Sequence, residues 1–266
     1  MIKAAVLGSP IAHSLSPRLH TAAYEFLKID GTYTSFDVPA GTLKNFLSDK
    51  SDSWTGFSLT MPLKEEALTC VDAMDPLVQR IQSGNTLVKE SSGWKLFSTD
   101  VLGFRNAWRM HNVNNPTSVV IIGSGATARA ALAAFDTSGT NFRVVHRNSE
   151  REDSMKNCLV DSSIEFHPWN FHDFILQADL VINTTPKLAL DGFSPEISSK
   201  PQGTFFDVIY NPWPTRFADV WRQEGGKVIG GLDLLIAQGV EQIKLFSKSI
   251  LPTDELTKYL RQGLTI

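Results

Sequence analysis

Cysteine, long apolar runs and an excess of charge of one sign are all scarce in this sequence. Only two cysteines occur among 266 residues, Cys70 and Cys158, far apart and outside any Cys-x-x-Cys pattern. We expect buried free thiols in a reducing compartment rather than a disulfide framework. No apolar run approaches the roughly 18 residues of a membrane-spanning helix, and the apolar stretch at the start is too short for a signal peptide. These absences predict a cytoplasmic globular protein.

The charge balance is close to neutral. Lys and Arg number 25 against 28 Asp and Glu, which leaves a formal net charge of −3. This balance excludes disorder driven by self-repulsion and gives no electrostatic reason to expect DNA, RNA or an anionic membrane as a partner. Metal-binding patterns are lacking as well, because His167 and His172 have no third ligand at metal spacing and no H-E-x-x-H occurs. We expect no metal site.

Strand-like and helix-like segments alternate in a first series that ends near residue 104. Hydrophobic residues make up 42% of the chain, enough for one large domain or two modest ones. Ser16 followed by Pro17 is typical of an N-cap and a first helical residue. The alternation predicts a mainly parallel α/β sheet. The expected strands are 4–7, 33–38, 56–60, 85–89 and 94–98, the last two forming a hairpin, and the expected helices are 17–28, 43–47 and one opened by Pro62.

A second α/β series follows a polar segment at 112–116, which we interpret as a linker after a helix at 101–110. From residue 232 onward the pattern is helical. The two series predict two α/β domains with a cleft between them, where small ligands commonly bind. The expected strands of the second series are 119–122, 143–145, 179–183, 205–209 and 227–229.

One glycine motif stands in the context that dinucleotide binding requires. The strand 119–122 leads into Gly123-Ser124-Gly125-Ala126-Thr127-Ala128 and then into the helix-prone RAALAAF, so G-x-G-x-x-A joins a strand to a helix. The first Gly permits a tight turn, the second lets the backbone approach a pyrophosphate, and Ala128 allows close packing of the helix on the strand. The helix N-terminus offers amide groups to the phosphates. The alternative is a glycine turn that binds no ligand.

The next strand decides between the two nicotinamide cofactors. A NAD site usually carries Asp or Glu about 20 residues after the glycines, where it holds the ribose hydroxyls. Here the strand ends in Val145-His146-Arg147-Asn148, without an acid. A guanidinium suits a 2′-phosphate, so the sequence favours NADP, with His146 and Arg147 at the cofactor. Glu150 and Asp153 lie nearby and keep NAD open, and Arg147 could instead be a solvated surface charge.

Seven segments, in this order along the chain, together resemble the shikimate dehydrogenase family. They are GSPIAHSLSPRLH near the N-terminus, GFSLTMPLK at 56–64, NTLV at 85–88, STDVLGF at 98–104, NTTP at 183–186, DVIYNPWPT at 207–215 and GLDLLIAQG at 231–239. The resemblance implies a soluble enzyme that reversibly reduces 3-dehydroshikimate to shikimate with NADPH. It also implies a substrate-binding domain at 1–104, completed by C-terminal helices at 232–266, and a Rossmann NADP-binding domain at 105–231.

The resemblance also implies roles for individual residues. Lys64 and Asp100 match the catalytic pair, in which an ammonium stabilises and protonates a developing alkoxide and a carboxylate orients it. Without the resemblance, a surface lysine and a helix N-cap would be the simpler interpretation of these two. The residues matched to substrate binding are Ser14 and Ser16, at the carboxylate, and Ser58, Thr60, Asn85, Thr99, Tyr210 and Gln238. The residues matched to the cofactor are Gly123, Ser124, Gly125, Ala126, Thr127, His146, Arg147 and Thr184.

Three departures from the family pattern fall near the expected substrate. Ser58 stands where Asn is typical, Ser98 replaces the Asn of N-T-D, and 82–86 reads QSGNT in place of G-A-x-N-T. An altered substrate shell keeps two alternatives open. One is an NAD-dependent quinate/shikimate dehydrogenase, and the other is a non-catalytic NADP(H)-binding paralogue that acts as a sensor or scaffold. The expected assembly is a monomer or a homodimer.

Overall fold

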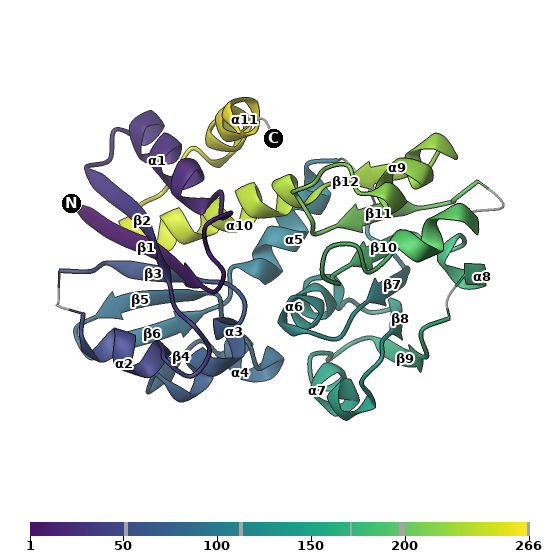
Figure 1. Cartoon of the computed structure of the whole chain (residues 1–266), viewed down its shortest axis with the longest axis horizontal. Coiled ribbons are helices and arrows are strands. Elements are labelled where there is room, and N and C mark those ends of the chain that lie inside the picture. The colour runs from purple at the N-terminus through teal and green to yellow at the C-terminus, as the bar shows by residue number, and fades with distance from the viewer. Residues whose placement is uncertain (51–52, 112–113, 171, 197–199, 265–266) are drawn as a thin grey trace. The chain divides into compact units, whose positions relative to one another are not determined.

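The computed structural model describes residues 1–50, 53–111, 114–170, 172–196 and 200–264, and the chain divides into two compact units (Figure 1). The first unit comprises Met1–Gly103 and Leu235–Thr265, and the second comprises Phe104–Leu234. Each unit is built around one six-stranded sheet. The expected class, two α/β domains of which one is Rossmann-like, is confirmed.

The sheet of the first unit is mixed. Its strand order is β2-β1-β3-β5-β6-β4, with β1 parallel to both β2 and β3, and with β5 antiparallel to β3 and to β6. The expected hairpin is β5–β6, and the sequence pattern did not predict the short β4. The strands are β1 Ile2–Gly8, β2 Gly31–Asp37, β3 Gly56–Leu59, β4 Ala73–Met74, β5 Thr86–Glu90 and β6 Gly93–Phe97. The helices are α1 Ser16–Leu27, α2 Leu43–Ser48, α3 Leu63–Glu66, α4 Pro76–Ile81, α10 Gly231–Ser247 and α11 Thr253–Gly263, with a 3-10 turn at Ala67–Thr69.

Helix α1 begins one residue earlier than the sequence predicts. Ser16 is its first helical residue, Leu15 occupies the N-cap position, and the Leu15 side chain makes no capping bond. The expected N-cap role of Ser16 is therefore wrong. Instead, Ser14 Oγ accepts a hydrogen bond from the Ser16 backbone N–H at 3.3 Å. The hydroxyl two residues upstream satisfies a free amide of the helix start.

The C-terminal helices return to the first unit, as expected. The rings of Phe26 on α1 and Tyr259 on α11 stack with their centroids 4.7 Å apart, and Figure 1 draws these two helices side by side. Farther along α10, the ring of Phe246 lies so close to Gly56 that any Cβ at this position of β3 would collide with it. Apolar contacts of this kind hold α10 and α11 against the first unit, so residues of α10 lie beside its sheet.

The second unit contains an entirely parallel sheet of order β12-β11-β10-β7-β8-β9. Read from β9, the chain order of the strands is 3-2-1-4-5-6, the doubly wound Rossmann arrangement, which reverses between β7 and β10. The strands are β7 Ser118–Ile122, β8 Asn141–Val145, β9 Ser163–His167, β10 Leu180–Asn183, β11 Thr204–Asp207 and β12 Lys227–Ile229. The helices are α5 Asp100–Arg109, which starts in the first unit, α6 Ala126–Phe135, α7 Glu152–Lys156, α8 His172–Ile175 and α9 Arg216–Gln223, with 3-10 turns at Ser149–Arg151 and Asp191–Glu196.

Burial explains which strands the sequence pattern reveals. All four residues of β10 and of β11 are buried, as expected for a parallel sheet covered on both faces, and both strands were predicted. The edge strand β9 has no fully buried residue and was missed. The linker prediction at 112–116 falls partly outside the described residues, because positions 112 and 113 are not among them.

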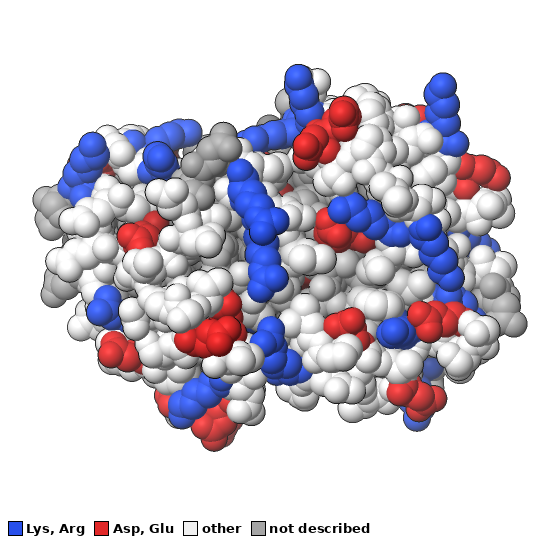
Figure 2. Space-filling view, turned by 180° about the vertical axis from the view of Figure 1, so that it is seen from behind, with Lys and Arg blue, Asp and Glu red and all other residues white. Residues whose placement is uncertain are grey.

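Charges of both signs mix on the face shown in Figure 2, as the balanced composition predicts, whereas one of the two cysteines is less buried than expected. On the face in Figure 2, basic and acidic side chains lie interspersed. Cys70 and Cys158 are both free thiols, with Cys158 buried and Cys70 only partly so. In the part of the chain that the structure describes, no helix combines the length and the apolar character needed to cross a membrane.

Candidate functional site

An ion pair between Lys64 and Asp100 forms the centre of a polar cluster in the first unit. Lys64 Nζ lies 2.6 Å from Asp100 Oδ2, and the two side chains are 16% and 8% exposed. Asp100 is the first residue of α5, where the helix dipole favours a carboxylate. A charged pair this far from water is held in one geometry only when its remaining polar atoms also have partners.

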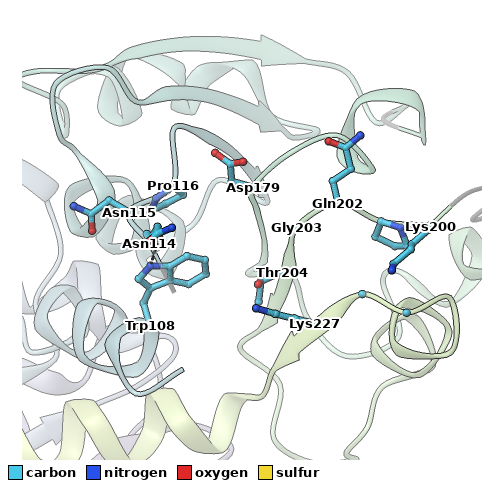
Figure 3. Close-up of a pocket in the computed structure, with 13 residues that line it drawn as sticks. Trp108, Asn114, Asn115, Pro116, Asp179, Lys200, Gln202, Gly203, Thr204 and Lys227 are labelled. Carbon is cyan, nitrogen blue, oxygen red and sulfur yellow. Dashed lines mark hydrogen bonds between the residues drawn. The ribbon is translucent and has the colours of Figure 1, made fainter. Parts of the chain in front are cut away.

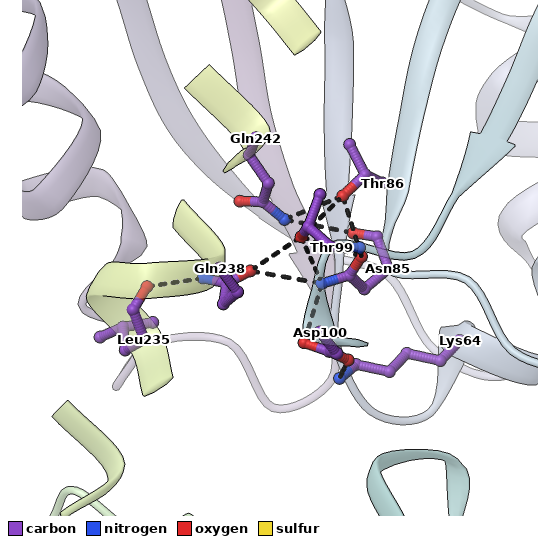
Figure 4. A network of polar contacts seen from close by, with 8 residues as sticks. All are labelled: Lys64, Asn85, Thr86, Thr99, Asp100, Leu235, Gln238 and Gln242. Atoms are coloured by element: carbon purple, nitrogen blue, oxygen red, sulfur yellow. Dashed lines mark hydrogen bonds and ion pairs between the residues drawn. The ribbon is translucent and has the colours of Figure 1, made fainter. Parts of the chain in front are cut away.

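Asn85 supplies the second partner of that carboxylate (Figure 4). Its Nδ2 donates to Asp100 Oδ1 at 2.9 Å, while its Oδ1 accepts from the backbone N–H of Thr99 at 2.7 Å. The Thr99 N–H can only donate, so it determines which end of the Asn85 amide is oxygen. Both carboxylate oxygens of Asp100 thus have a donor within the unit, one from an amide and one from an ammonium.

Gln238 and Thr99 join the same cluster. Gln238 Oε1 lies 3.3 Å from Asn85 Nδ2, and its Nε2 donates to the backbone oxygen of Leu235 one turn earlier on α10. Thr99 Oγ1 accepts a hydrogen bond of 2.9 Å from Asn85 Nδ2. The structure therefore brings together five of the sequence-predicted site residues from four separate segments, namely Lys64, Asn85, Thr99, Asp100 and Gln238.

Helix α3 holds Lys64 although it has only four residues. Leu63 is fully buried, and the backbone oxygen of Lys64 accepts from Gly84 N–H at 3.0 Å. The carboxylate of Glu66 binds the amides of Gly41 and Leu43 at 2.8 and 2.9 Å, which ties α3 to the start of α2. Such a short helix cannot be stable alone, so these tertiary contacts set the position of the lysine.

Ser14, Ser16 and Thr60 lie where chain segments leave β1 and β3. The backbone N–H of Thr60 donates to the oxygen of Leu7 at 2.9 Å, and any Cβ at Gly8 would collide with the Thr60 side chain. Glycine at position 8 therefore permits the close approach of the two loops. Among the described residues, no hydrogen bond links the hydroxyls of these three residues to the Lys64 cluster.

Ser58 is placed differently from the other predicted substrate residues. It is buried on β3, where its Oγ accepts from the hydroxyl of Tyr33 at 2.6 Å and donates to Gln242 Oε1 at 2.8 Å. Sequence reasoning missed Gln242. A signal was available, because Gln238 and Gln242 are four residues apart on one helix and so share a face.

The glycine loop of the second unit has the conformation that the motif predicts. Gly123 has φ +114°, a region that side-chain-bearing residues rarely adopt, and any Cβ there would collide with Thr184 Oγ1. That hydroxyl donates to the backbone oxygen of Ile122 at 2.9 Å, which holds Thr184 against the loop. The predicted residues Gly123 and Thr184 are therefore neighbours. Gly125 is the N-cap of the ten-residue helix α6 and, having no side chain, leaves its first amides uncapped. Ser124, Ala126 and Thr127, all partly exposed, complete the loop at the topological switch point.

A second arginine, which the sequence reasoning missed, lies against this loop. Arg151 Nη1 donates to the backbone oxygen of Ser124 at 3.3 Å, and it is also the atom nearest to a Cβ built on Gly125, at 3.7 Å. The available signal was its spacing, four residues after Arg147. Its guanidinium adds positive charge beside the open amides of α6, which suits a phosphate group.

The two residues predicted at the end of β8 differ in exposure. Arg147 is exposed, and its guanidinium lies 5.1 Å from the centre of the Trp169 ring. His146 is buried, with Nδ1 at 2.9 Å from the oxygen of Asn148 and Nε2 at 3.3 Å from Glu152 Oε1. Arg147 is thus available to a ligand at the carboxyl end of β8, whereas both nitrogens of His146 already have partners in the protein.

Tyr210 belongs to the second unit, in the segment after β11. This segment is anchored by the fully buried carboxylate of Asp207, which accepts hydrogen bonds from Asn183 Nδ2, Thr215 Oγ1 and the Ile209 backbone N–H at 3.0, 2.7 and 3.1 Å. Burial raises the pKa of Asp207, and the three hydrogen bonds offset this only in part. The anchor holds the backbone immediately before Tyr210.

A cavity of about 410 Å³ lies near the amino-terminal ends of strands β10, β11 and β12 of the second sheet (Figure 3). Its lining includes Thr204 and Lys227, the first residues of β11 and β12, and Asp179, the residue directly before β10, together with Trp108. The glycine loop follows the carboxyl end of β7, and in a parallel sheet the amino-terminal strand ends lie on the other side. None of the predicted site residues lines this cavity. Also among the described residues, no group of three or more His, Cys, Asp or Glu side chains is arranged to hold a metal ion.

Comparison with known proteins relates this chain to shikimate dehydrogenases. Residues 6–87 match the family model described as the shikimate dehydrogenase substrate binding domain. The chain is 33% identical over 245 residues to the shikimate dehydrogenase (NADP(+)) of Ignicoccus hospitalis, covering 91% of this chain and 92% of that protein. The crystal structure of Mycobacterium tuberculosis shikimate dehydrogenase superposes with a TM-score of 0.86 at 32% identity, covering 98% of this chain and 100% of that one. The Thermus thermophilus enzyme in complex with NADP(H) and shikimate gives a TM-score of 0.84 at 29% identity, covering 99% and 100%.

Proposed function

The chain belongs to the shikimate dehydrogenase family, and we propose that it catalyses the reversible NADP-dependent interconversion of 3-dehydroshikimate and shikimate. The observation that carries this proposal is the ion pair of Lys64 and Asp100, with Asn85 on the second carboxylate oxygen. A family member that had become a binding protein would have no need to keep a poorly hydrated ammonium on a carboxylate.

In the reducing direction, Lys64 acts on the oxygen of the substrate ketone. NADPH, when bound, supplies the hydride. As negative charge develops on the ketone oxygen, the ammonium of Lys64 stabilises it and donates a proton to it, so that the product is an alcohol. Asp100 holds Nζ through Oδ2, and Asn85 keeps the carboxylate from rotating. In the oxidising direction, Lys64 takes the proton back from the alcohol.

The remaining polar residues of the first unit bind the substrate. Ser14 and Ser16, at the start of α1, hold the carboxylate through their hydroxyls, since both of their backbone amides already have acceptors in the protein. Thr60, Asn85, Thr99 and Gln238 contact the ring hydroxyls, and Tyr210 of the second unit contacts the substrate near the nicotinamide. Ser58 already donates its proton to Gln242. Its contacts favour an indirect contribution to the substrate shell.

The second unit binds NADP(H) at its glycine loop. The loop 123–127 and the first amides of α6 hold the pyrophosphate, with Thr184 beside Gly123, since the loop backbone is open at Gly125. Arg147 and Arg151 hold the 2′-phosphate, because each offers planar donors matched to phosphate oxygens. His146, whose nitrogens are occupied, shapes the end of β8 beside the adenosine.

Initial-rate assays test the proposal directly. Shikimate and quinate are each offered with NADP and with NAD, at fixed ionic strength. We expect the highest kcat/KM for shikimate with NADP. Faster turnover of quinate with NAD would identify the alternative dehydrogenase. Binding of NADP(H) without turnover of either substrate would identify a sensor or scaffold.

Compartment and assembly also belong to the proposal. A small polar substrate and a nicotinamide cofactor are consistent with a cytoplasmic enzyme whose partners are small molecules. For the assembly we propose a monomer or a homodimer. Size-exclusion chromatography with light scattering at two protein concentrations distinguishes these two and detects any larger assembly.

A further inference from the structure

Gln242 connects the Lys64 cluster to a second set of buried polar groups. Its side chain is 2% exposed and has partners at both ends of the amide. Oε1 accepts from Ser58 Oγ at 2.8 Å and lies 3.2 Å from His20 Nε2. Nε2 donates to Thr86 Oγ1 at 3.1 Å and to the backbone oxygen of Asn85 at 3.4 Å. Because a backbone carbonyl can only accept, Asn85 O determines which end of the Gln242 amide is nitrogen.

On the Oε1 side, Tyr33, Ser58 and His20 form hydrogen bonds whose donors all point in the direction of Gln242. Burial raises the pKa of Tyr33 strongly, so its phenol stays protonated and donates to Ser58 Oγ at 2.6 Å. The Ser58 proton is then left for Gln242. Burial lowers the pKa of His20 to about 3, so the ring is neutral. A neutral ring with its proton on Nε2 donates to Gln242 and leaves Nδ1 bare, which agrees with the lack of a hydrogen-bond partner for that buried atom among the described residues.

On the other side, the hydrogen-bond direction continues toward Asp100. Thr86 Oγ1 accepts from Gln242 and donates its own proton to Asn85 Oδ1 at 3.0 Å. With Oδ1 occupied by Thr86 and by the Thr99 N–H, the Nδ2 end of Asn85 faces Asp100 Oδ1. The path from Tyr33 through Ser58, Gln242, Thr86 and Asn85 to Asp100 therefore has one consistent direction. Figure 4 shows the part from Gln242 to Lys64.

We propose that Gln242 is a positioning residue that acts through Thr86 to hold the Asn85 amide with its nitrogen on Asp100. This inference rests on the proposed function, in which Asp100 orients Lys64. The Gln242 amide reaches Asn85 in two ways, directly at the backbone oxygen and through the Thr86 hydroxyl. Of the two, only Thr86 contacts the Asn85 side-chain amide, so the effect on the orientation of that amide passes through the Thr86 hydroxyl. Hydrogen bonds in a buried chain of this kind strengthen one another, so loss of one member weakens the rest.

Two pairs of near-isosteric variants test the proposal. Gln242→Glu keeps the size but loses both N–H donors, and Gln242→Met loses the polar atoms altogether. Thr86→Val removes the relaying hydroxyl, whereas Thr86→Ser keeps it and should retain near wild-type behaviour. Gln79→Met, at an exposed glutamine on α4, is the matched control. Thr86→Val and Thr86→Ser keep the test decisive if a charge or a thioether at position 242 prevents folding.

We expect Gln242→Met and Thr86→Val each to lower kcat/KM for shikimate about tenfold, the scale of one buried hydrogen bond. The dissociation constant for NADP should change less than about twofold, because the glycine loop belongs to the other unit. The double variant should lose little more than either single variant, since both interrupt one path. Losses that multiply, or a Thr86→Ser variant as impaired as Thr86→Val, would overturn the proposal.

A spectroscopic measurement tests the chain without any turnover. The side-chain amide protons of Asn85, identified by their loss in Asn85→Asp, should shift in Gln242→Met and Thr86→Val but not in Thr86→Ser or Gln79→Met. Unchanged Asn85 signals in the first two variants would refute the positioning role. If the wild-type protein failed to oxidise shikimate, the proposed function would fall, whereas this measurement would still decide whether Gln242 orients Asn85.

Discussion

Lys64 and Asp100 lie 36 positions apart in the sequence and meet with Nζ 2.6 Å from Oδ2. The second carboxylate oxygen is held by Asn85 at 2.9 Å, so Asp100 cannot rotate away from the lysine without breaking another hydrogen bond. This arrangement keeps the ammonium in one place before any substrate binds. Preorganised donors of this kind lower the barrier because they need not be reoriented as charge develops.

Replacing Lys64 by Ala should lower kcat by about 10²-fold or more, the scale of a positioned acid/base group. The affinity for NADP should hardly change, because the glycine loop lies in the other unit. Steady-state rates and a fluorescence titration with NADP measure the two effects. Lys44→Ala, an exposed lysine on α2, is the control. A Lys64→Ala variant within about threefold of the wild-type kcat would remove this lysine from the mechanism.

Replacing both Ser14 and Ser16 by Ala should raise KM for shikimate more than it lowers kcat. A carboxylate remote from the reacting carbon is held equally in the ground state and the transition state. The single variants separate binding from capping, because the Ser14 hydroxyl caps the helix start. Ser14→Ala should therefore lower the free energy of unfolding by about 0.5–2 kcal/mol, and Ser16→Ala by less. An unchanged KM in the double variant would leave Ser14 with its capping role alone.

Replacing Arg147 or Arg151 by Ala should weaken NADP and leave NAD almost unaffected. A charge-assisted contact to the 2′-phosphate of about 1.5–3 kcal/mol corresponds to about 10- to 150-fold in discrimination. Arg147 is exposed, so its share should shrink at high salt. The measurement compares kcat/KM for both cofactors at two ionic strengths, with Arg143→Ala, on the same strand β8, as the control. Equal losses for NADP and NAD would show that the arginine contacts something other than the 2′-phosphate.

His20 should make the protein less stable as the pH falls below neutrality. Its pKa is about 3 in the folded state against 6.5 in the unfolded chain, so the unfolded state binds more protons between these two values. The free energy of unfolding therefore rises with pH through this window and levels off above it. Between pH 7 and pH 5 the expected loss is about 2 kcal/mol.

Urea unfolding at several pH values measures this dependence. The variant His20→Gln should show a shallower slope than the wild type, whatever its stability at pH 7. His13→Gln, at an exposed ring near the end of β1, is the control and should keep the wild-type slope. A wild-type slope in His20→Gln would assign the acid sensitivity to other groups.

Local patterns in the sequence were enough to predict the parts of the molecule that depend on neighbours in the chain. The buried strands β10 and β11 follow from short apolar runs, and the glycine loop follows from a motif whose strand, turn and helix are consecutive. Lys64 and Asp100 were singled out by resemblance, since neither residue type has a local pattern that marks it. The exposed alternation of β9 carried too little apolar signal to be recognised.

Which polar atoms meet depends instead on the folded chain. The contact of His20 with Gln242 joins positions 222 residues apart, and the contact of Asn85 with Gln238 joins positions 153 residues apart. Folding also places Arg151 on the glycine loop and gives the capping role to Ser14 rather than Ser16. A buried polar group must find a partner, and that requirement acts on atoms brought close by the packing of strands and helices rather than on neighbours in the chain. The hydrogen-bond partner of a buried polar group is therefore determined by the tertiary structure and not by the local sequence.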